Sequence, residues 1–142
     1  MSKEAPQLNN CLYFSVNALG RVLTKMAEEE FSITGLPPSY AFILRAANHV
    51  PGIQPKELSR EMMLSPSTIT RLVDKLVLRG FLTRQTEGRS CLIHPTQKSL
   101  DLEETIAVAW SNLHKRYCAL LGEEIASELT TKAYQASKEL EN

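Results

Sequence analysis

Residues 58–98, LSREMMLSPSTITRLVDKLVLRGFLTRQTEGRSCLIHPTQK, decide the fold of this chain. Within them, Ser65 is a residue type that caps helix N-termini, and Pro66 fits the first helical position, where its missing N–H is no loss. Gly80 supplies a typical helix end. Between these signals lies an apolar stripe at helical spacing, made of Ile69, Leu72, Val73, Leu76 and Val77. The pattern predicts a helix that begins at Pro66 and ends near Gly80.

Shorter elements flank this helix on both sides. Before it, Pro55 begins a short predicted helix, and residues 63–65 form the turn that links the two. After it come two β-like runs, residues 81–84 and 91–93, separated by a polar loop over residues 85–90. The order helix, turn, helix, hairpin predicts a winged helix-turn-helix, whose second helix enters the major groove of DNA.

The two ends of the chain predict longer helices. No proline lies between Gln7 and Leu36, and none follows Pro95. Apolar spacing predicts helices over about residues 8–30 and 39–49, a long helix after an N-cap at Thr96, and a last helix after Gly122. The predicted fold class is mainly α with a small β-hairpin. We expect a single domain over residues 1–142, with a DNA-binding lobe at 36–95 and helical dimerisation regions at 1–35 and 96–142.

Charge is unevenly distributed along the 142 residues. Sixteen basic and sixteen acidic residues give a net charge of zero. Residues 65–98, however, carry six basic residues against two acidic ones, a net charge of +4, and residues 99–142 carry a net charge of −4. A charged partner responds to the field within about 8–10 Å, so this segregation favours a polyanion as the partner of the central segment.

The outward face of the helix that begins at Pro66 combines short hydroxyls with cations. Serine and threonine can bind phosphates or bases, and arginine is the commonest reader of guanine. In the hairpin, Arg89 beside Gly88 is placed to reach the minor groove, and Arg84 to meet phosphates. A solvated helix face would carry the same residue types, but the whole combination favours DNA. The predicted DNA-binding residues are Ser65, Ser67, Thr68, Thr70, Arg71, Lys75, Arg84, Gly88 and Arg89.

Residues 58–102 resemble the winged helix-turn-helix core of the MarR family, the bacterial multiple antibiotic resistance regulators. The resemblance rests on the serine-rich recognition helix, the leucine-to-glycine stop at residues 76–80, and the wing with an arginine at its tip. The tip, Glu87-Gly88-Arg89, departs from the family pattern because its middle residue is not basic. The resemblance implies a homodimeric transcriptional regulator, a repressor of a palindromic operator that is released by a small ligand.

The terminal helices also indicate a dimer. A helix over residues 97–121 would be a rod of about 37 Å, comparable with the diameter of a compact chain of this length. Its apolar residues, with those of the first and last helices, would leave exposed patches that monomers avoid. The alternative is a monomeric bundle that covers its own apolar stripes.

The resemblance further implies a small aromatic or other organic effector, bound between the dimerisation region and the DNA-binding lobe. By this analogy, the residues of its wall are Tyr13, Phe14, His49 and Trp110. The alternative is that these aromatic side chains belong to the core.

Cys11 lies near the start of the first predicted helix, a position that favours the thiolate. A branch of the family senses organic hydroperoxides through a cysteine in this helix, so redox sensing through Cys11 is an alternative mechanism. Cys11 is displaced by about two residues from that branch's pattern, however, and burial as a small apolar residue is the simpler expectation. Cys91 and Cys118 are expected to be packed.

Several classes of function find no support in the sequence. His49, His94 and His114 lie far apart, so we expect no metal and no cofactor, and no nucleophile or phosphate-loop motif indicates an enzyme. No apolar run approaches the roughly 20 residues of a membrane span, and an odd number of cysteines favours a reduced cytoplasm. One further alternative is a winged module that binds proteins and not DNA, because the net charge is zero and the wing tip is reduced.

Overall fold

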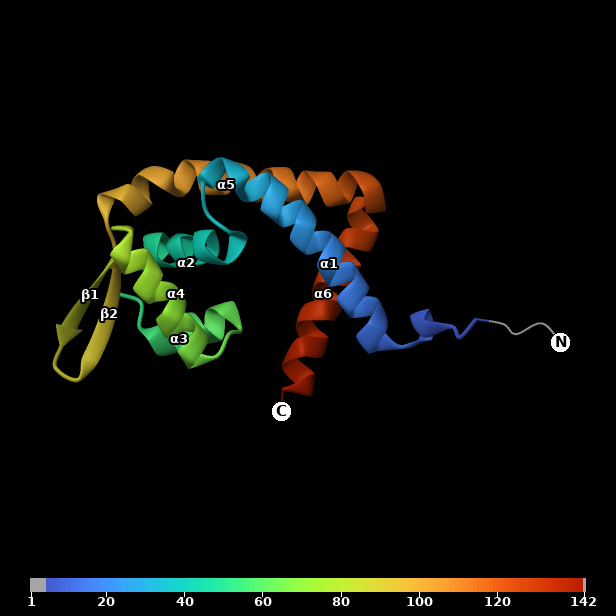
Figure 1. The fold of residues 1–142 in the computed structure, drawn as a ribbon, viewed down its shortest axis with the longest axis horizontal. Helices are drawn as coiled ribbons and strands as arrows, with labels where there is room; N and C mark the ends of the chain where they lie inside the picture. The colour runs from blue at the N-terminus through green and yellow to red at the C-terminus, as the bar shows by residue number, and fades with distance from the viewer. Residues whose placement is uncertain (1–4, 142) are drawn as a thin grey trace.

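The computed structural model describes residues 5–141, which form a mainly helical fold with one two-stranded hairpin (Figure 1). The helices are α1 (Leu12–Phe31), α2 (Pro38–His49), α3 (Pro55–Met62), α4 (Pro66–Leu78), α5 (Gln97–Leu121) and α6 (Glu123–Leu140). The hairpin consists of β1 (Leu82–Glu87) and β2 (Ser90–Pro95), and two short 3-10 helices, η1 (Leu8–Asn10) and η2 (Ser32–Thr34), flank α1. The predicted fold class, mainly α with a small β-hairpin, is confirmed.

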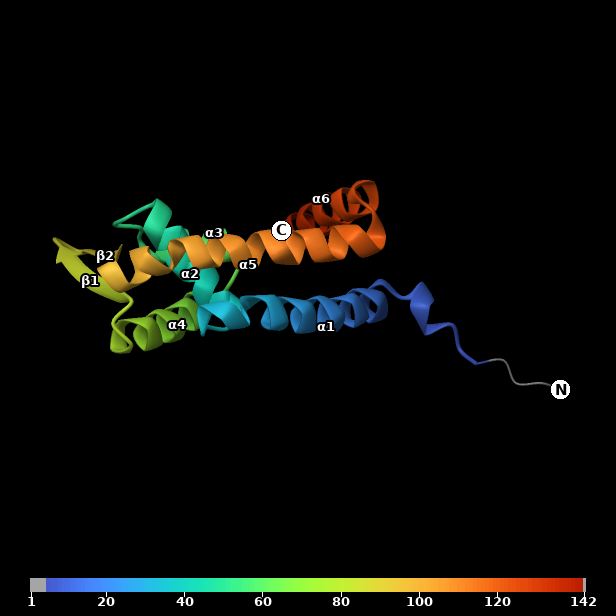
Figure 2. The same ribbon diagram turned by 90° about the horizontal axis from the view of Figure 1, so that it is seen from above.

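The elements form a lobe, which consists of α2, α3, α4 and the hairpin, and a helical arm, which consists of α1, α6 and the part of α5 beside them. Helices α2, α3 and α4 gather with the hairpin at one end, where α5 begins (Figure 1). Helix α5 runs from the lobe along the whole arm, α1 lies beside it, and α6 folds back beneath its far end (Figures 1 and 2). The Arg116 Nη1 atom in α5 forms ion pairs with two carboxylates of α1, at 2.8 Å from Glu29 Oε2 and 3.1 Å from Glu30 Oε2. Helix α5 therefore connects the lobe to the arm.

Helix α4 has the ends that the sequence predicts. The Ser65 hydroxyl accepts a hydrogen bond from the Thr68 backbone N–H at 3.3 Å. Gly80, at a φ of 80°, takes the left-handed conformation that ends the helix and directs the chain into β1. The side chains of Ile69, Leu72, Val73 and Leu76 are buried in the core of the lobe, so this stripe fixes which face of α4 points outward.

The hairpin corrects the sequence prediction. The strands were expected to be short and joined by a loop over residues 85–90, but pairing continues from Leu82↔Pro95 to Glu87↔Ser90. Only Gly88 and Arg89 remain between the strands, with Gly88 at a φ of 63°. Residues 83–87 are exposed, so no buried apolar face marked them as a strand. Backbone pairing alone extends this ribbon.

The start of the first helix differs from expectation, and α5 begins after Thr96 as expected but without the expected cap hydrogen bond. The first helix was expected from about Leu8, but residues 8–10 form η1, Cys11 is extended, and α1 begins at Leu12. Thr96 occupies the N-cap position of α5, but its side chain makes no cap hydrogen bond. Its hydroxyl lies 2.6 Å from the Gly80 carbonyl and 3.0 Å from the Phe81 carbonyl, so it fastens the end of α4 to the start of α5.

The core lies almost entirely in the lobe and the adjoining half of α5. Its fully buried large side chains include Phe31, Ile43, Leu44, Leu58, Ile69, Leu76, Ile93 and Ile106. The arm is different, because apolar side chains such as Leu12, Val22, Leu120 and Ile125 are exposed there. Among the described residues, no helix has the length and apolar character needed to cross a membrane.

Candidate nucleic-acid interface and the adjoining pocket

The outer face of α4 is exposed and polar. Ser67, Thr70, Arg71 and Lys75 are exposed on it, as is the cap Ser65, whereas Thr68 is half-buried. Arg71 and Lys75 make no ion pair with any described residue. The cations predicted to contact DNA from this helix are therefore free to bind a partner.

Three hydroxyl groups meet at the N-terminus of α4. The Ser65 Oγ atom lies 2.8 Å from Thr68 Oγ1 and 3.3 Å from Ser67 Oγ. The Thr70 hydroxyl donates to the Pro66 carbonyl at 3.0 Å, so its oxygen can still accept a hydrogen bond. Helix N-termini favour anions, because their free N–H groups point outward and the dipole is positive there. This end of α4 is suited to a phosphate.

Arg84 is placed differently from the sequence expectation. It was predicted to meet phosphates from the base of the hairpin, but its Nη2 atom forms an ion pair with Asp74 Oδ1 of α4. The Arg84 side chain is about one-third exposed (33%). Arg84 and Asp74 are ten residues apart, and no local sequence pattern predicts that they pair. The turn at Gly80 and the direction of β1 bring them together. Arg84 thus links the hairpin to α4.

The tip of the hairpin extends away from the lobe. Gly88 and Arg89 are both exposed, and the Arg89 guanidinium forms no ion pair within residues 5–141. In Figure 1 the tip of the hairpin and the N-terminal end of α4 both lie toward the lower side of the lobe. The hairpin tip, which consists of Gly88 and Arg89, and the start of α4 are therefore on the same side in this view.

Two of the six basic residues in segment 65–98 lie elsewhere. Arg79 and Lys98 flank the Phe81 ring, at 5.6 and 4.3 Å from its centroid, and Lys98 also donates to the Arg79 carbonyl at 2.9 Å. They sit at the C-terminal end of α4, opposite the end with the hydroxyl groups. The local excess of positive charge is consequently shared between both ends of α4.

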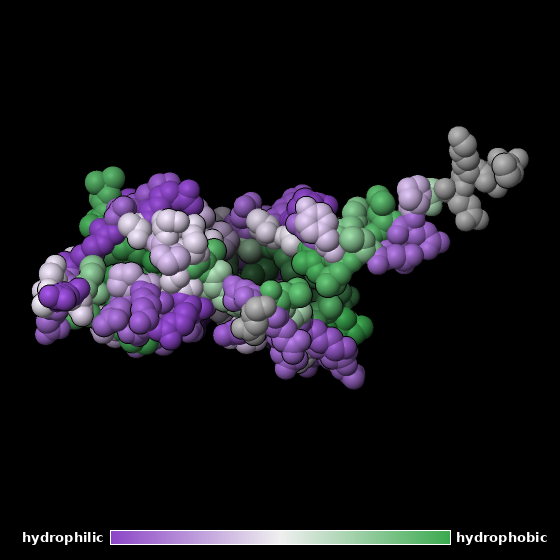
Figure 3. All heavy atoms as spheres, turned by 90° about the horizontal axis from the view of Figure 1, so that it is seen from below, coloured by the Kyte–Doolittle hydropathy of each residue, from purple (hydrophilic) through white to green (hydrophobic). Residues whose placement is uncertain are grey.

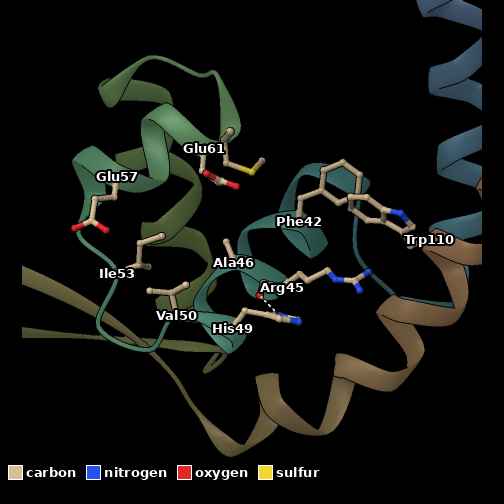
Figure 4. Close-up of a pocket in the computed structure, with 10 residues that line it drawn as sticks. Phe42, Arg45, Ala46, His49, Val50, Ile53, Glu57, Glu61 and Trp110 are labelled. Carbon is tan, nitrogen blue, oxygen red and sulfur yellow. Dashed lines mark hydrogen bonds between the residues drawn. The ribbon is translucent and has the colours of Figure 1, made fainter. Parts of the chain in front are cut away.

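A pocket of about 440 Å³ lies between α2, α3 and α5 (Figure 4). Phe42 and Trp110 form an aromatic wall, with ring centroids 4.9 Å apart, and the Arg45 guanidinium lies 4.9 Å from the Trp110 ring centroid. Of the four predicted effector residues, His49 and Trp110 line this pocket. Tyr13 and Phe14 do not, because they are exposed at the start of α1, at the far end of the arm. None of the four belongs to the buried core.

A polar network joins α2 to α5 beside this pocket. The Ser99 hydroxyl, fully buried, donates to Asn48 Oδ1 at 2.7 Å, and the Asn48 amide donates to Glu103 Oε2 at 2.8 Å. Glu103 Oε1 lies 3.6 Å from Arg45 Nε and 3.7 Å from His49 Nδ1. The cationic side of the pocket is therefore connected to α5 through a single carboxylate.

The cysteines provide little support for a thiol centre. Cys11 is exposed rather than buried as expected, and its thiol makes no hydrogen bond with any described residue. Cys118, half-buried on α5, has its Sγ atom 3.6 Å from His114 Nε2. Redox sensing through Cys11 remains a prediction.

A helix-turn-helix whose second helix has a polar cationic face, followed directly by a hairpin, defines the class of winged-helix proteins. Residues 34–90 match the sequence model of the MarR family. This match agrees with the resemblance seen in the sequence, and the whole chain has the fold of solved MarR-family proteins.

Three solved structures illustrate this similarity in fold. PcaV from Streptomyces coelicolor, in complex with its natural ligand, is 20% identical with a TM-score of 0.84 over 96% of this chain and 98% of that one. CouR from Rhodococcus jostii RHA1, bound to p-coumaroyl-CoA, is 22% identical with a TM-score of 0.76 over 91% and 93%. MepR from S. aureus, in complex with DNA, is 12% identical with a TM-score of 0.78 over 92% and 98%. A search of curated proteins gives no match.

Proposed function

We propose that this chain is a homodimeric, sequence-specific DNA-binding repressor that acts in the cytoplasm on a palindromic operator. The observation that carries the proposal is the exposed face of α4, where Arg71 and Lys75 have no ion-pair partner among the described residues, followed directly by a hairpin whose tip carries the exposed Arg89. The role requires no catalysis, metal or cofactor.

Each part of this surface has a proposed role on the duplex. Arg71 and Lys75 enter the major groove, where arginine reads guanine through its O6 and N7 atoms. The hydroxyls of Ser65, Ser67, Thr68 and Thr70 surround a phosphate at the helix N-terminus. Arg89, beside Gly88, reaches the minor groove. Arg84 positions the wing through Asp74 and contributes its remaining N–H groups to phosphates. The MepR–DNA complex supports this docking by analogy of fold.

The arm supplies the proposed dimer interface, residues 1–35 and 96–142, and residues 36–95 form the DNA-binding lobe. Exposed apolar side chains line α1, the end of α5 and α6, including Leu12, Val16, Leu120, Ile125 and Leu140. Figure 3 shows apolar surface near the start of α1 and in the hollow between lobe and arm. Soluble monomers avoid such surface, so a second copy of the chain is its proposed cover. A two-fold dimer would present two α4 helices to half-sites about 10 base pairs apart.

The pocket beside α3 is the proposed effector site, with His49 and Trp110 in its wall. It lies where α5 meets α2 and α3, so a ligand wedged there would tilt the lobe against the arm and change the spacing of the two α4 helices. PcaV and CouR, both solved with bound ligands, support a ligand-responsive fold of this kind. Tyr13 and Phe14 do not line this pocket, so in this proposal they contribute to an effector site only if the α1 helix of a second copy brings them to it.

Selection of bound duplexes from a random DNA pool tests the proposal. We expect a palindrome, bound with an affinity that falls steeply as salt rises. Arg71→Ala and Arg89→Ala should abolish this binding, while Lys56→Ala, an exposed cation of α3 outside the proposed DNA-contacting residues, should leave it unchanged. Weak, salt-insensitive binding with no selected sequence, unchanged in both variants, would instead favour a module that binds proteins.

A further inference from the structure

The cation that lines the pocket between α2, α3 and α5, Arg45, already lies beside a carboxylate. Arg45 Nε and His49 Nδ1 lie 3.6 and 3.7 Å from the same Glu103 oxygen. The Arg45 guanidinium also lies over the Trp110 ring, and His49 Nδ1 is 2.8 Å from the Arg45 carbonyl oxygen. Figure 4 shows both side chains directed toward α5. An anionic ligand would therefore share Arg45 with Glu103.

The negative charges on the opposite wall have no such partners. Glu57 and Glu61 lie one turn apart on α3 and both line the pocket. Neither carboxylate forms an ion pair within residues 5–141. In Figure 4 the Glu61 carboxylate lies on the side of α3 that faces α2, and that of Glu57 lies at the outer rim. The charge left unbalanced around the pocket is negative.

Between these walls the pocket is apolar and aromatic. Phe42 and Trp110 form one side of it, and Ile53 and Met62, next to and at the end of α3, form the other. A volume of about 440 Å³ holds a ring with a short chain. Aromatic faces attract cations, and Trp110 already carries one in Arg45.

From this asymmetry we infer that the pocket selects a small aromatic cation, with its ring beside Phe42 and its ammonium group toward Glu61. This inference rests on the proposed effector site and specifies the class of its ligand. An aromatic carboxylate of the same shape would place a like charge beside Glu61, and it would compete with Glu103 for Arg45. The preference for a cation thus follows because Arg45 already has a carboxylate partner, whereas Glu61 has no ion-pair partner among the described residues.

Three compounds of one shape test the inference on the full chain: 4-butylbenzylamine, 4-butylbenzyl alcohol and 4-butylbenzoate, which are respectively cationic, neutral and anionic at neutral pH. Trp110 is the only tryptophan of the chain, so its fluorescence reports binding directly. We expect the amine to bind about tenfold more tightly than the benzoate, with the alcohol between them. Glu61→Gln should weaken the amine about fivefold and leave the alcohol unchanged. Glu87→Gln, an exposed carboxylate of the hairpin, is the matched control.

Tighter binding of the benzoate would overturn the inference and leave the effector site in place. Equal affinity for all three compounds, or no fluorescence change up to their solubility, would also overturn it. Operator binding, measured on the same preparation by fluorescence anisotropy of labelled DNA, separates these outcomes from failure of the proposed regulator. If the protein binds its operator while the amine does not bind the pocket, only the ligand inference fails.

Discussion

The guanidinium of Arg84 in β1 donates a hydrogen bond to the carboxylate of Asp74 in α4. This ion pair connects the wing with the helix proposed to read the major groove. It also removes Asp74 as a free negative charge from the outer face of α4, where it would repel phosphates. The angle between α4 and the hairpin therefore depends on a contact between side chains as well as on the turn at Gly80.

We expect Asp74→Ala and Arg84→Ala each to weaken operator binding about five- to tenfold, because either change releases the wing. The pair is partly exposed, so the free energy of unfolding should change by less than about 1 kcal/mol. Fluorescence anisotropy and urea denaturation measure the two quantities. The double variant should lose no more affinity than the single variants, and additive losses would show that the two residues act independently.

Ser65→Ala removes the side chain that caps α4 at the Thr68 N–H. Loss of such a cap costs about 1 kcal/mol, so the urea midpoint should fall while the dependence of unfolding on urea stays constant. Ser67→Ala, two residues later and exposed, is the control for stability. An equal loss of stability in both variants would contradict the capping role.

Ser99→Ala should destabilise the junction between α2 and α5. It would leave the Asn48 Oδ1 atom without its 2.7 Å donor in a partly buried position, which costs about 1–3 kcal/mol. Thermal unfolding of the purified variant measures the loss. Asn48→Ala combined with Ser99→Ala should lose less stability than the sum of the two single variants, because both changes remove the same hydrogen bond. Strictly additive losses would refute this explanation.

Leu12→Glu and Leu120→Glu each place a charge on the apolar surface of the arm, where the native side chains are 68% and 77% exposed. If a second copy covers this surface, both variants should shift from dimer to monomer in analytical ultracentrifugation. Leu78→Glu is the control, because Leu78 is 87% exposed at the end of α4 in the lobe. The same mass for all three variants would place the dimer interface elsewhere.

Cys11→Ser tests the thiol alternative. The Cys11 thiol is exposed and has no hydrogen-bond partner in the described part of the chain. We expect operator binding in the presence of an organic hydroperoxide to be the same in this variant and in the native protein. If peroxide releases the native protein from DNA but not the variant, Cys11 is a redox sensor after all.

Local signals in the sequence are sufficient to predict α4 and the face that it buries. The cap at Ser65, the stop at Gly80 and the apolar stripe between them are local signals, and each acts within a few residues of the helix it shapes. The same holds for the order of the six helices, because proline, glycine and 3.6-residue spacing mark them along the chain. The exposed face of α4, with Arg71 and Lys75, followed directly from knowing which face is buried.

Tertiary structure decided the features that join separate elements. The hairpin is longer than predicted because backbone pairing extends it where no side chain is buried. The partnership of Arg84 with Asp74, and that of Arg45 with Glu103, depends on how β1 packs beside α4 and α2 beside α5. Residues that are distant in sequence meet only after these elements have packed, and local patterns carry no information about the distance between them.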